Sequence, residues 1–340
     1  MLFKRKIKIL STLSVVILLF FIWDSYRFMS TEMNIPDEGI NYTFPRGSSA
    51  SRLITDLKKQ SVITHPFYFK LWGKLSGKTK SLQAGEYVLE NGLSPFNLLH
   101  KMNKGDVKLY AFTIIEGWSF KQLMQAVHED KNLVHKLDSN ANNDFIMKKL
   151  NYPDQHPEGR FYPDTYRYPA GTTDIQFLRR AYQQMEQHLE QEWQNRAKGL
   201  PLKNSYEALT LASIVEKESA EPSERPVIAG VFINRLIKKM RLQTDPTVIY
   251  GLGDSYKGDI RFRHLREDTP YNTYTRKGLP PTPIAMPGLQ AIKAALNPEL
   301  TEYLYFVATG EGGKHYFSAT NAEHQRAVTK YQRYKRRKKK

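Results

Sequence analysis

The first long apolar stretch of the chain lies close to its N-terminus. Residues 7–23 are apolar apart from Lys8, Ser11, Thr12 and Ser14. This length is close to the roughly 20 residues that a membrane-spanning helix needs. The pattern therefore predicts a single N-terminal transmembrane helix, placed at residues 7–27.

The charges around this stretch predict its orientation. Basic residues crowd its N-terminal side, and Asp24 follows it at once. By the positive-inside rule, residues 1–6 are expected in the cytoplasm and everything after Trp23 outside. A cleaved signal peptide is the alternative, but it has a shorter apolar stretch followed by a small-x-small cleavage site. Residues 24–30 offer no such site, so we expect a retained anchor.

The next segments alternate between strand-like and helical patterns. Residues 30–38 are polar and carry a proline, which is typical of a linker, and the linker is placed at residues 28–38. Residues 44–54 and 114–124 share one pattern, in which an apolar approach leads to a glycine, then to Ser49 or Ser119 two places on, then to helical spacing. Each predicts a strand that ends in a turn, with the serine capping the following helix.

Residues 39–110 are expected to form a small subdomain. Residues 82–89 add a strand with a glycine turn, which gives a strand, turn, helix and strand arrangement. This size and order fit a glycan-binding module of LysM type. A generic α+β subdomain that only positions the rest of the chain fits equally well.

Two patterns precede the most informative segment. Residues 159–169 are rich in aromatic residues and interrupted by proline, which excludes a regular helix or a central strand. Their rings could stack on sugars, although aromatic side chains more often fill a core. Residues 174–197 then carry apolar side chains at three- and four-residue steps, which predicts an amphipathic helix.

Residues 206–218 predict a helix with a carboxylate in the place of a hydrophobic residue. Leu211, Ile214, Val215 and Glu218 fall at i, i+3, i+4 and i+7, which is one apolar stripe. A carboxylate among apolar neighbours has its ionised form disfavoured, which raises its pKa and suits it to general acid catalysis. Glu218 is therefore the candidate catalytic acid.

A structural role for Glu218 is the alternative. Interior carboxylates often pair with arginine, and Arg225 or Arg235 could be that partner. Glu216 and Lys217 fall off the stripe and are expected to be solvated.

Composition and charge narrow the classes little. There are no cysteines, which excludes disulfides, thiolate metal sites and cysteine nucleophiles. The net charge of +17 suits nucleic acid, anionic lipid or an acidic polymer. Residues 331–340 form a basic tail that is expected to be disordered and solvated. His315 and His324 have no spacing that matches a zinc site, so no metal and no cofactor is expected.

Several motifs follow one another in order through the C-terminal two-thirds of the chain. They are ASIVEKES at 212–219, VFINRL at 231–236, MRLQTDPTVIY at 240–250, YNTY at 271–274, GLPPTPI at 278–284 and HYFSAT at 315–320. Together with the N-terminal anchor and the LysM-like part, the chain resembles the YceG-like (MltG) family of endolytic murein transglycosylases along essentially its whole length.

The resemblance implies a fold, a reaction and a location. The fold is α+β, with a catalytic domain of YceG-like type at residues 111–330. The reaction is that of a lyase, which cleaves the bond between N-acetylmuramic acid and N-acetylglucosamine within nascent glycan strands and so limits their elongation. The protein is a single-pass inner-membrane protein with a periplasmic catalytic domain, working on peptidoglycan glycan strands beside peptidoglycan synthases. The second glutamate of the Glu-Lys-Glu motif, Glu218, is the catalytic one.

The need for a second carboxylate separates two mechanisms. Most glycosidases use two carboxyl groups, and Asp245 is the candidate partner for a hydrolytic muramidase. A lytic transglycosylase needs none, because the C6 hydroxyl of muramic acid closes a 1,6-anhydro ring. Asp245 then shapes the cleft or accepts a sugar hydroxyl, or it only forms the turn before Pro246. By motif membership and polar chemistry, the other expected sugar-binding residues are Gln243, Thr247, Tyr250, Asn272 and Tyr274.

Two other classes compete with an enzyme. A membrane-tethered, non-catalytic glycan-binding scaffold fits the basic charge and predicts that Glu218→Gln leaves cellular function intact. A nucleic-acid binder rests on net charge alone. It lacks a recognition motif, and the predicted topology puts the domain on the wrong side of the membrane, so no nucleic-acid partner is expected.

Overall fold

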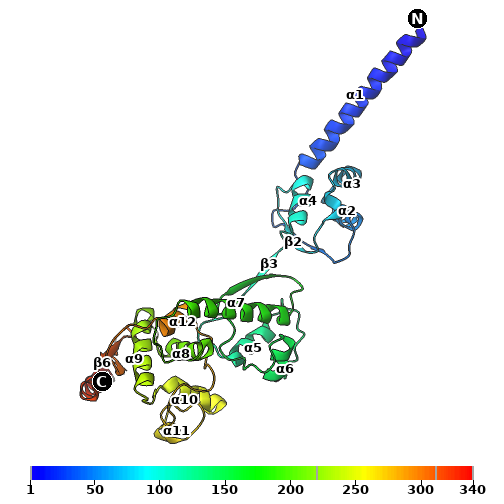
Figure 1. Cartoon of the computed structure of the whole chain (residues 1–340). Helices are drawn as coiled ribbons and strands as arrows, with labels where there is room; N and C mark the ends of the chain where they lie inside the picture. The colour runs from blue at the N-terminus through cyan, green and yellow to red at the C-terminus, as the bar shows by residue number, and fades with distance from the viewer. Residues whose placement is uncertain (1, 220, 311, 339–340) are drawn as a thin grey trace. The chain divides into compact units, whose positions relative to one another are not determined.

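The computed structural model describes residues 2–219, 221–310 and 312–338, and it divides into two compact units (Figure 1). Unit 1 comprises Met1–Tyr110 with Arg167–Gly171, and unit 2 comprises Ala111–Tyr166 with Thr172–Lys340. Helices dominate both units, and the strands within the described ranges pair in two-stranded sheets. The α+β class expected from the sequence is confirmed.

Helix α1 (Leu2–Ser30) is long and apolar enough to cross a membrane over Ile7–Ser30, with a mean hydropathy of 2.0. Its apolar side chains from Ile7 to Trp23 are mostly exposed, and it extends beyond the rest of unit 1 (Figure 1). Exposed apolar side chains are costly in water and favourable in lipid. The helix suggests a membrane anchor.

The end of α1 and the segment after it are part of the folded core of unit 1. Met29, Met33 and Ile35 are all buried, at 0%, 6% and 5% exposure. Tyr68 also donates a hydrogen bond of 2.8 Å to Asp24. The segment at 28–38, interpreted from its polarity as a linker, therefore packs through a few apolar side chains, and the unit begins before Gly39.

Unit 1 has the order strand, two helices, strand, helix. Its elements are β1 (Ile40–Phe44), α2 (Ala50–Lys59), α3 (Pro66–Leu75), the 3₁₀ turn η1 (Lys78–Lys80), β2 (Gly85–Leu89) and α4 (Pro95–Lys104). β1 and β2 pair antiparallel with Tyr42 opposite Tyr87, and both rings are buried. This order agrees with the LysM-type hypothesis, which stays a prediction.

One local motif occurs four times among the residues that the structure describes. Each strand from β1 to β4 is followed by a glycine at positive φ and, two residues later, by a Ser or Thr whose side chain caps the next helix. The pairs are Gly47 with Ser49, Gly92 with Ser94, Gly117 with Ser119, and Gly171 with Thr173. Glycine suits the left-handed turn, and the hydroxyl satisfies a free N–H of the helix. The two caps expected at Ser49 and Ser119 are confirmed, and two more exist.

Unit 2 is largely helical. Together with the β3–β4 sheet, its elements are β3 (Leu109–Thr113), α5 (Phe120–Glu129), α6 (Asn143–Lys149), β4 (Thr165–Pro169), α7 (Asp174–Gln194), α8 (Ser205–Glu218), η2 (Pro222–Glu224), α9 (Arg225–Ile237), α10 (Asp245–Leu252), η3 (Gly253–Ser255), α11 (Phe262–Arg266), α12 (Leu289–Leu296), β5 (Tyr305–Ala308), β6 (His315–Ser318) and α13 (Asn321–Lys338). Helix α8 packs against α7, α9, α10 and α12, so it lies at the centre of the core.

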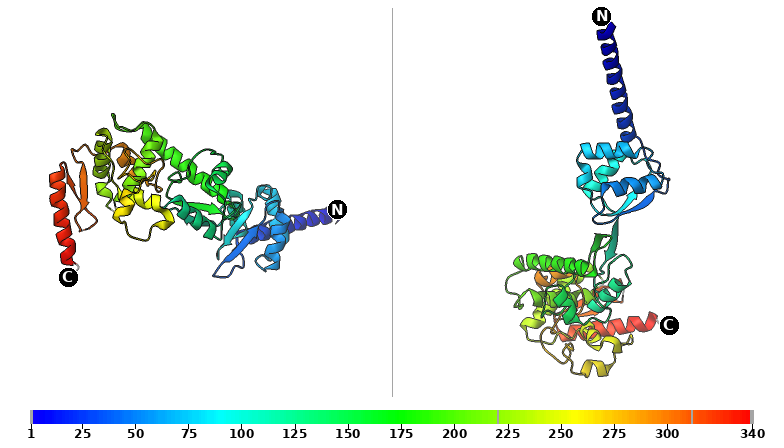
Figure 2. Two further views of the ribbon diagram at one scale, coloured as in Figure 1. Left: turned by 90° about the horizontal axis from the view of Figure 1, so that it is seen from below. Right: turned by 90° about the vertical axis from the view of Figure 1, so that its right-hand side faces the viewer.

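Two segments of unit 2 test further expectations. The aromatic run supplies Phe161, Tyr162 and Tyr166 to the core, where all three are buried. The predicted disordered tail at residues 331–340 is helical as far as Lys338, because α13 continues to that residue. This helix packs on the β5–β6 hairpin (Figure 2). Residues 339–340 of the predicted tail lie outside the described residues.

Candidate active site

Helix α8 carries Glu218 as its last residue. The helix begins at Ser205 and is capped by Asn204, whose side chain accepts a hydrogen bond of 2.9 Å from the N–H of Glu207. Every residue from Ala208 to Val215 is buried, so α8 is surrounded on all sides and is not the one-sided amphipathic helix predicted from the stripe. A helix that is apolar all round belongs in a core. The stripe residues are buried as expected, and Glu218 emerges where the core ends.

The environment of Glu218 favours the protonated acid. Its side chain is half-buried, and burial is the main cause that raises the pKa of Glu218 to about 6, with the negative charge of Asp245 adding to it. The position at the C-terminal end of α8 acts in the same direction, because this end of a helix is electronegative. A hydrogen bond from Thr244 and the charges of His315 and Arg235 lower the pKa in part.

The hydroxyl of Thr244 donates to Oε1 of Glu218 and is itself held in a buried threonine cluster. The N–H of Thr244 donates to Oγ1 of Thr273 at 3.1 Å. Thr247 donates to the carbonyl of Thr244 at 2.8 Å, and its hydroxyl lies 2.9 Å from that of Thr273. These hydrogen bonds hold Thr244 in place, and its hydroxyl in turn orients the carboxylate of Glu218.

Asp245 lies beside this cluster, as the first residue of α10. Its Oδ1 accepts a hydrogen bond of 2.6 Å from the hydroxyl of Tyr274. Asp245 itself is exposed. Burial and the neighbouring carboxylates of Asp245 and Glu218 raise the pKa of Tyr274. The phenol of Tyr274 therefore keeps its proton and donates it to the hydrogen bond. Asp245 and Tyr274 thus lie in the electrostatic surroundings of Glu218.

Arg225 and Arg235, the candidate structural partners of Glu218, are engaged elsewhere. Arg225 pairs with Glu216 at 2.7 Å, with side-chain exposures of 9% and 5%. Glu216 also accepts from the N–H of Gly288 at 3.0 Å, so the prediction that Glu216 is solvated was wrong. Arg235 donates to the carbonyls of Leu304 and Leu242. His315, another residue whose charge acts on Glu218, pairs with Glu224 at 2.7 Å. The interior glutamate paired with arginine is Glu216.

The remaining predicted sugar-binding residues fall into three environments. Gln243 is exposed, at a positive φ of 51°. Thr247 and Asn272 are buried, and Asn272 donates to the carbonyls of His264 and Glu267, which holds the loop before Tyr274. Tyr250 faces a separate cavity. Sugar contact by any of them stays a prediction.

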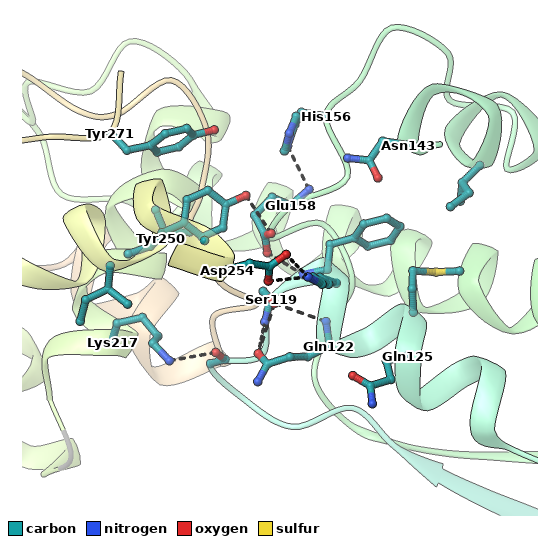
Figure 3. A pocket seen from close by; sticks show the side chains of 18 of the residues that line it. Ser119, Gln122, Gln125, Asn143, His156, Glu158, Lys217, Tyr250, Asp254 and Tyr271 are labelled. Carbon is teal, nitrogen blue, oxygen red and sulfur yellow. Dashed lines mark hydrogen bonds and ion pairs between the residues drawn. The ribbon is translucent and has the colours of Figure 1, made fainter. Parts of the chain in front are cut away.

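That cavity lies within unit 2 between α5–α6 and α10, and has a volume of about 1250 Å³ (Figure 3). Its lining includes Lys217, Pro246, Tyr250, Tyr271 and Glu158. Lys217 precedes Glu218 on α8, and Pro246 follows Asp245 on α10. Both elements that form the surroundings of Glu218 therefore also border the cavity.

Glu158 is a second buried carboxylate, which the sequence did not reveal. It is 3% exposed. Oε1 accepts from the N–H of Phe120 at 2.9 Å, and Oε2 accepts from the hydroxyl of Tyr250 at 3.0 Å. Burial raises the pKa of Glu158 to about 7, although the hydrogen bonds from Tyr250, Phe120 and Gly159 and the charge of Lys217 oppose the rise. Glu158 follows a proline in a loop without hydrophobic periodicity, so only the tertiary structure shows its burial.

The fold and the site define an α+β protein with a half-buried carboxylic acid of raised pKa at the end of a core helix. This arrangement can exchange a proton near neutral pH. Residues 42–330 match the YceG-like family, and the chain belongs to that family.

Relatives of known name agree with this assignment. The chain is 35% identical to the endolytic murein transglycosylase of Bacillus subtilis, over 86% of this chain and 84% of that protein. It is 30% identical to the endolytic murein transglycosylase of Streptococcus pneumoniae, over 84% of this chain and 57% of that longer protein. The crystal structure of a yceG-like protein from Listeria monocytogenes is similar, with a TM-score of 0.54, 33% identity and coverage of 86% of this chain and 99% of that one.

Proposed function

We propose that this protein is an endolytic peptidoglycan lytic transglycosylase with Glu218 as its catalytic residue. The observation that carries the proposal is the carboxyl of Glu218, which has a pKa raised to about 6 and a hydrogen bond from Thr244 that orients it. The likeness to two named endolytic murein transglycosylases supports the substrate class.

In the proposed mechanism one carboxyl group acts twice. Protonated Glu218 donates its proton to the oxygen that links N-acetylmuramic acid to N-acetylglucosamine, and the bond from that oxygen to C1 of the muramic acid breaks. The C6 hydroxyl of the same muramic acid attacks C1, and the Glu218 carboxylate accepts its proton. The products are a 1,6-anhydromuramic acid end and a free C4 hydroxyl on the glucosamine, and no water is consumed. The intramolecular nucleophile brings a high effective concentration.

Asp245 has a supporting part in this mechanism. Its Oδ1 accepts from Tyr274, and its charge lies near enough to Glu218 to raise the pKa of that residue. A hydrolytic muramidase would instead use Asp245 to activate a water molecule on the sugar face opposite Glu218.

Product analysis in H₂¹⁸O separates these mechanisms. The full-length protein in detergent is incubated with peptidoglycan glycan strands, and the new ends are analysed by mass spectrometry. For the wild type we expect 1,6-anhydro ends without ¹⁸O. The activity of Glu218→Gln should be lower than that of the wild type by at least about 10³-fold. Glu207→Gln is the matched control, since Glu207 lies in the first turn of the same helix. Reducing ends that carry ¹⁸O would establish hydrolysis, and an active Glu218→Gln would remove Glu218 from the mechanism.

The cellular context follows from the anchor. We propose that α1 holds the protein in the inner membrane with its N-terminus in the cytoplasm and units 1 and 2 in the periplasm, where cleavage of nascent strands beside peptidoglycan synthases limits strand elongation. Protease added to spheroplasts should digest units 1 and 2. If Glu218→Gln cleaves nothing and still restores glycan strand length in a deletion strain, the non-catalytic scaffold is the better description.

A further inference from the structure

The cavity between α5–α6 and α10 has the size and position of a binding site for part of a polymer. Its volume of about 1250 Å³ exceeds the roughly 300–1,000 Å³ of sites for single small molecules. Lys217 and Pro246, which border it, are chain neighbours of Glu218 and Asp245. Neither Glu218 nor Asp245 lines the cavity itself, so the link between the two is that α8 and α10 contribute residues to both. An enzyme that cuts within a strand has to hold sugars on both sides of the cleaved bond, and a cavity bordered by these two helices could hold some of them.

The lining has few unpaired charges. Lys121 and Asp254 pair with each other at 2.6 Å. Lys217 donates to the carbonyl of Gly117 at 3.2 Å. Neutral amides supply much of the remaining polarity, from Gln122, Gln125 and Asn143 (Figure 3). The oxygen of Gln122 also accepts from Ser119, and Gln125 also donates to Glu129, which leaves part of each amide to a ligand. Amides recognise hydroxyl and acetamido groups, so this chemistry favours a neutral sugar over a charged peptide.

Aromatic rings provide one wall of the cavity. Tyr250 and Tyr271 have ring centroids 4.8 Å apart and planes inclined at 60°. The hydroxyl of Tyr271 is engaged with Thr282 at 2.9 Å, and that of Tyr250 with Glu158. Both phenols are therefore held in position, with apolar ring surface available to the apolar face of a sugar.

Glu158 is the polar group at the base of this wall. Its two oxygens accept from the N–H of Phe120, the hydroxyl of Tyr250 and the N–H of Gly159, whereas an ionised carboxylate has about four acceptor sites. Figure 3 shows Glu158 among the lining side chains, next to Tyr250. Among the described residues it forms no ion pair, so the remaining acceptor capacity is available to a ligand.

We propose that this cavity binds the N-acetylated sugar units next to the cleaved bond, with Glu158 accepting a hydrogen bond from a sugar hydroxyl or acetamido N–H and with Tyr250 and Tyr271 as the aromatic wall. The proposal rests on the proposed function, since it assigns a part of the same substrate. The competing explanation is that Glu158 only caps α5 through the N–H of Phe120.

Binding of a peptide-free N-acetylglucosamine hexasaccharide tests the proposal. The full-length Glu218→Gln protein in detergent is titrated calorimetrically, alone and with Glu158→Gln added. The amide oxygen of glutamine can still accept from Phe120, so the cap is retained, but an NH₂ group, which cannot accept, replaces the second carboxyl oxygen. We expect the affinity to fall at least about fivefold. Glu192→Gln is the matched control, because Glu192 is a buried glutamate that does not line the cavity.

A second variant keeps the test decisive if Glu158→Gln does not fold. Asn143 is exposed at the start of α6 and points into the cavity in Figure 3, so Asn143→Trp narrows the cavity without disturbing the core. It should weaken hexasaccharide binding with an unchanged Tm. Unchanged affinity in Asn143→Trp, or tighter binding of an isolated stem peptide than of the hexasaccharide, would overturn the proposal.

The outcome is separable from that of the proposed function. If Glu218→Gln still cleaves strands, the proposed function fails, whatever the cavity binds. If Glu218→Gln is inactive and Glu158→Gln, while folded, binds the hexasaccharide as well as its parent does, only the assignment of the cavity fails.

Discussion

Thr244 donates its hydroxyl hydrogen bond to the carboxyl of Glu218 from a position that is itself 1% exposed. Burial and the hydrogen bond from Thr244 have opposite effects on the protonation of Glu218. Burial holds the proton on Glu218, and the hydrogen bond from Thr244 favours its release. The balance leaves the pKa of Glu218 at about 6, where both forms are accessible near neutral pH. A residue that acts first as an acid and then as a base needs this balance.

The first prediction concerns Thr244→Val, which removes the hydroxyl and keeps the shape of the side chain. Without this donor the ionised form of Glu218 loses stabilisation, so the pKa of Glu218 should rise further and the alkaline limb of kcat/KM should move to higher pH. The Glu218 carboxylate, which accepts a proton in the second step, also loses the hydrogen bond that orients it, so kcat should fall about 3- to 30-fold. A pH–rate profile with glycan strands measures both effects.

Thr210→Val is the control for this prediction. Thr210 is buried on α8, and its hydroxyl donates only to the carbonyl of Tyr206 at 2.9 Å. Its replacement should leave the pH profile in place. A profile of Thr244→Val that coincides with that of the wild type would show that Thr244 does not tune Glu218.

The second prediction is the pH dependence of the wild-type enzyme. A general acid has to be protonated in the free enzyme, and the pKa of Glu218 is about 6. At pH values above 6 the protonated fraction falls tenfold for each pH unit, so kcat/KM should fall with it. The measurement is kcat/KM from pH 5 to pH 8. Activity that rises through this range would assign Glu218 to the role of a base in the first step.

The sequence could predict the element that carries the site. Hydrophobic spacing placed a helix at 206–218 with Glu218 in the position of a core residue, and α8 ends at that residue. The glycine and serine pattern predicted the turn and cap at Ser49 and Ser119, because the chemistry of a cap is local. These features depend on residues within one or two turns of each other.

Other features depend on contacts between distant segments. Glu216 lies off the predicted stripe, yet it meets Arg225 nine residues later and the N–H of Gly288 on another element, which buries it. Glu158 meets Phe120 and Tyr250, which are far away in sequence. No periodicity along one segment reports such contacts. Sequence pattern alone therefore could not tell which of the glutamates are buried.

The third prediction compares two arginine–carboxylate pairs of similar length and different burial. Arg225 and Glu216 lie 2.7 Å apart with exposures of 9% and 5%, and Arg276 and Asp268 lie 2.9 Å apart with exposures of 51% and 58%. Arg225→Met leaves an uncompensated buried carboxylate and should lower the free energy of unfolding by about 3–5 kcal/mol. Arg276→Met should lower the free energy of unfolding far less than Arg225→Met does, because both groups are exposed and solvent screens their attraction.

Urea unfolding of the full-length variants in detergent measures the difference. Equal losses for the two variants would mean that the buried charge of Glu216 is relieved in the folded protein, for example by taking up a proton. In that case the loss in Arg225→Met should shrink at lower pH.

The fourth prediction rests on the proton that Glu158 holds in the folded state. Its pKa is about 7 when folded, compared with an ordinary value of 4.5. Between these two values the folded protein binds the proton and the unfolded chain does not. The folded state therefore loses relative stability as the pH rises from 4.5 to 7, and the loss approaches about 3 kcal/mol because Glu158 is almost fully buried.

Glu158→Gln removes this dependence, since the amide does not titrate. Relative to the wild type, the variant should gain stability as the pH rises from 5 to 8, by about 1–3 kcal/mol over that range. At pH 5 the variant should be the less stable of the two proteins, because Glu158 of the wild type is then protonated and buries no unpaired charge. Thermal unfolding of both full-length proteins at pH 5, 6, 7 and 8 measures the two curves. Parallel curves would show that Glu158 keeps its charge in the folded protein, with its hydrogen bonds from Phe120 and Tyr250 compensating the burial.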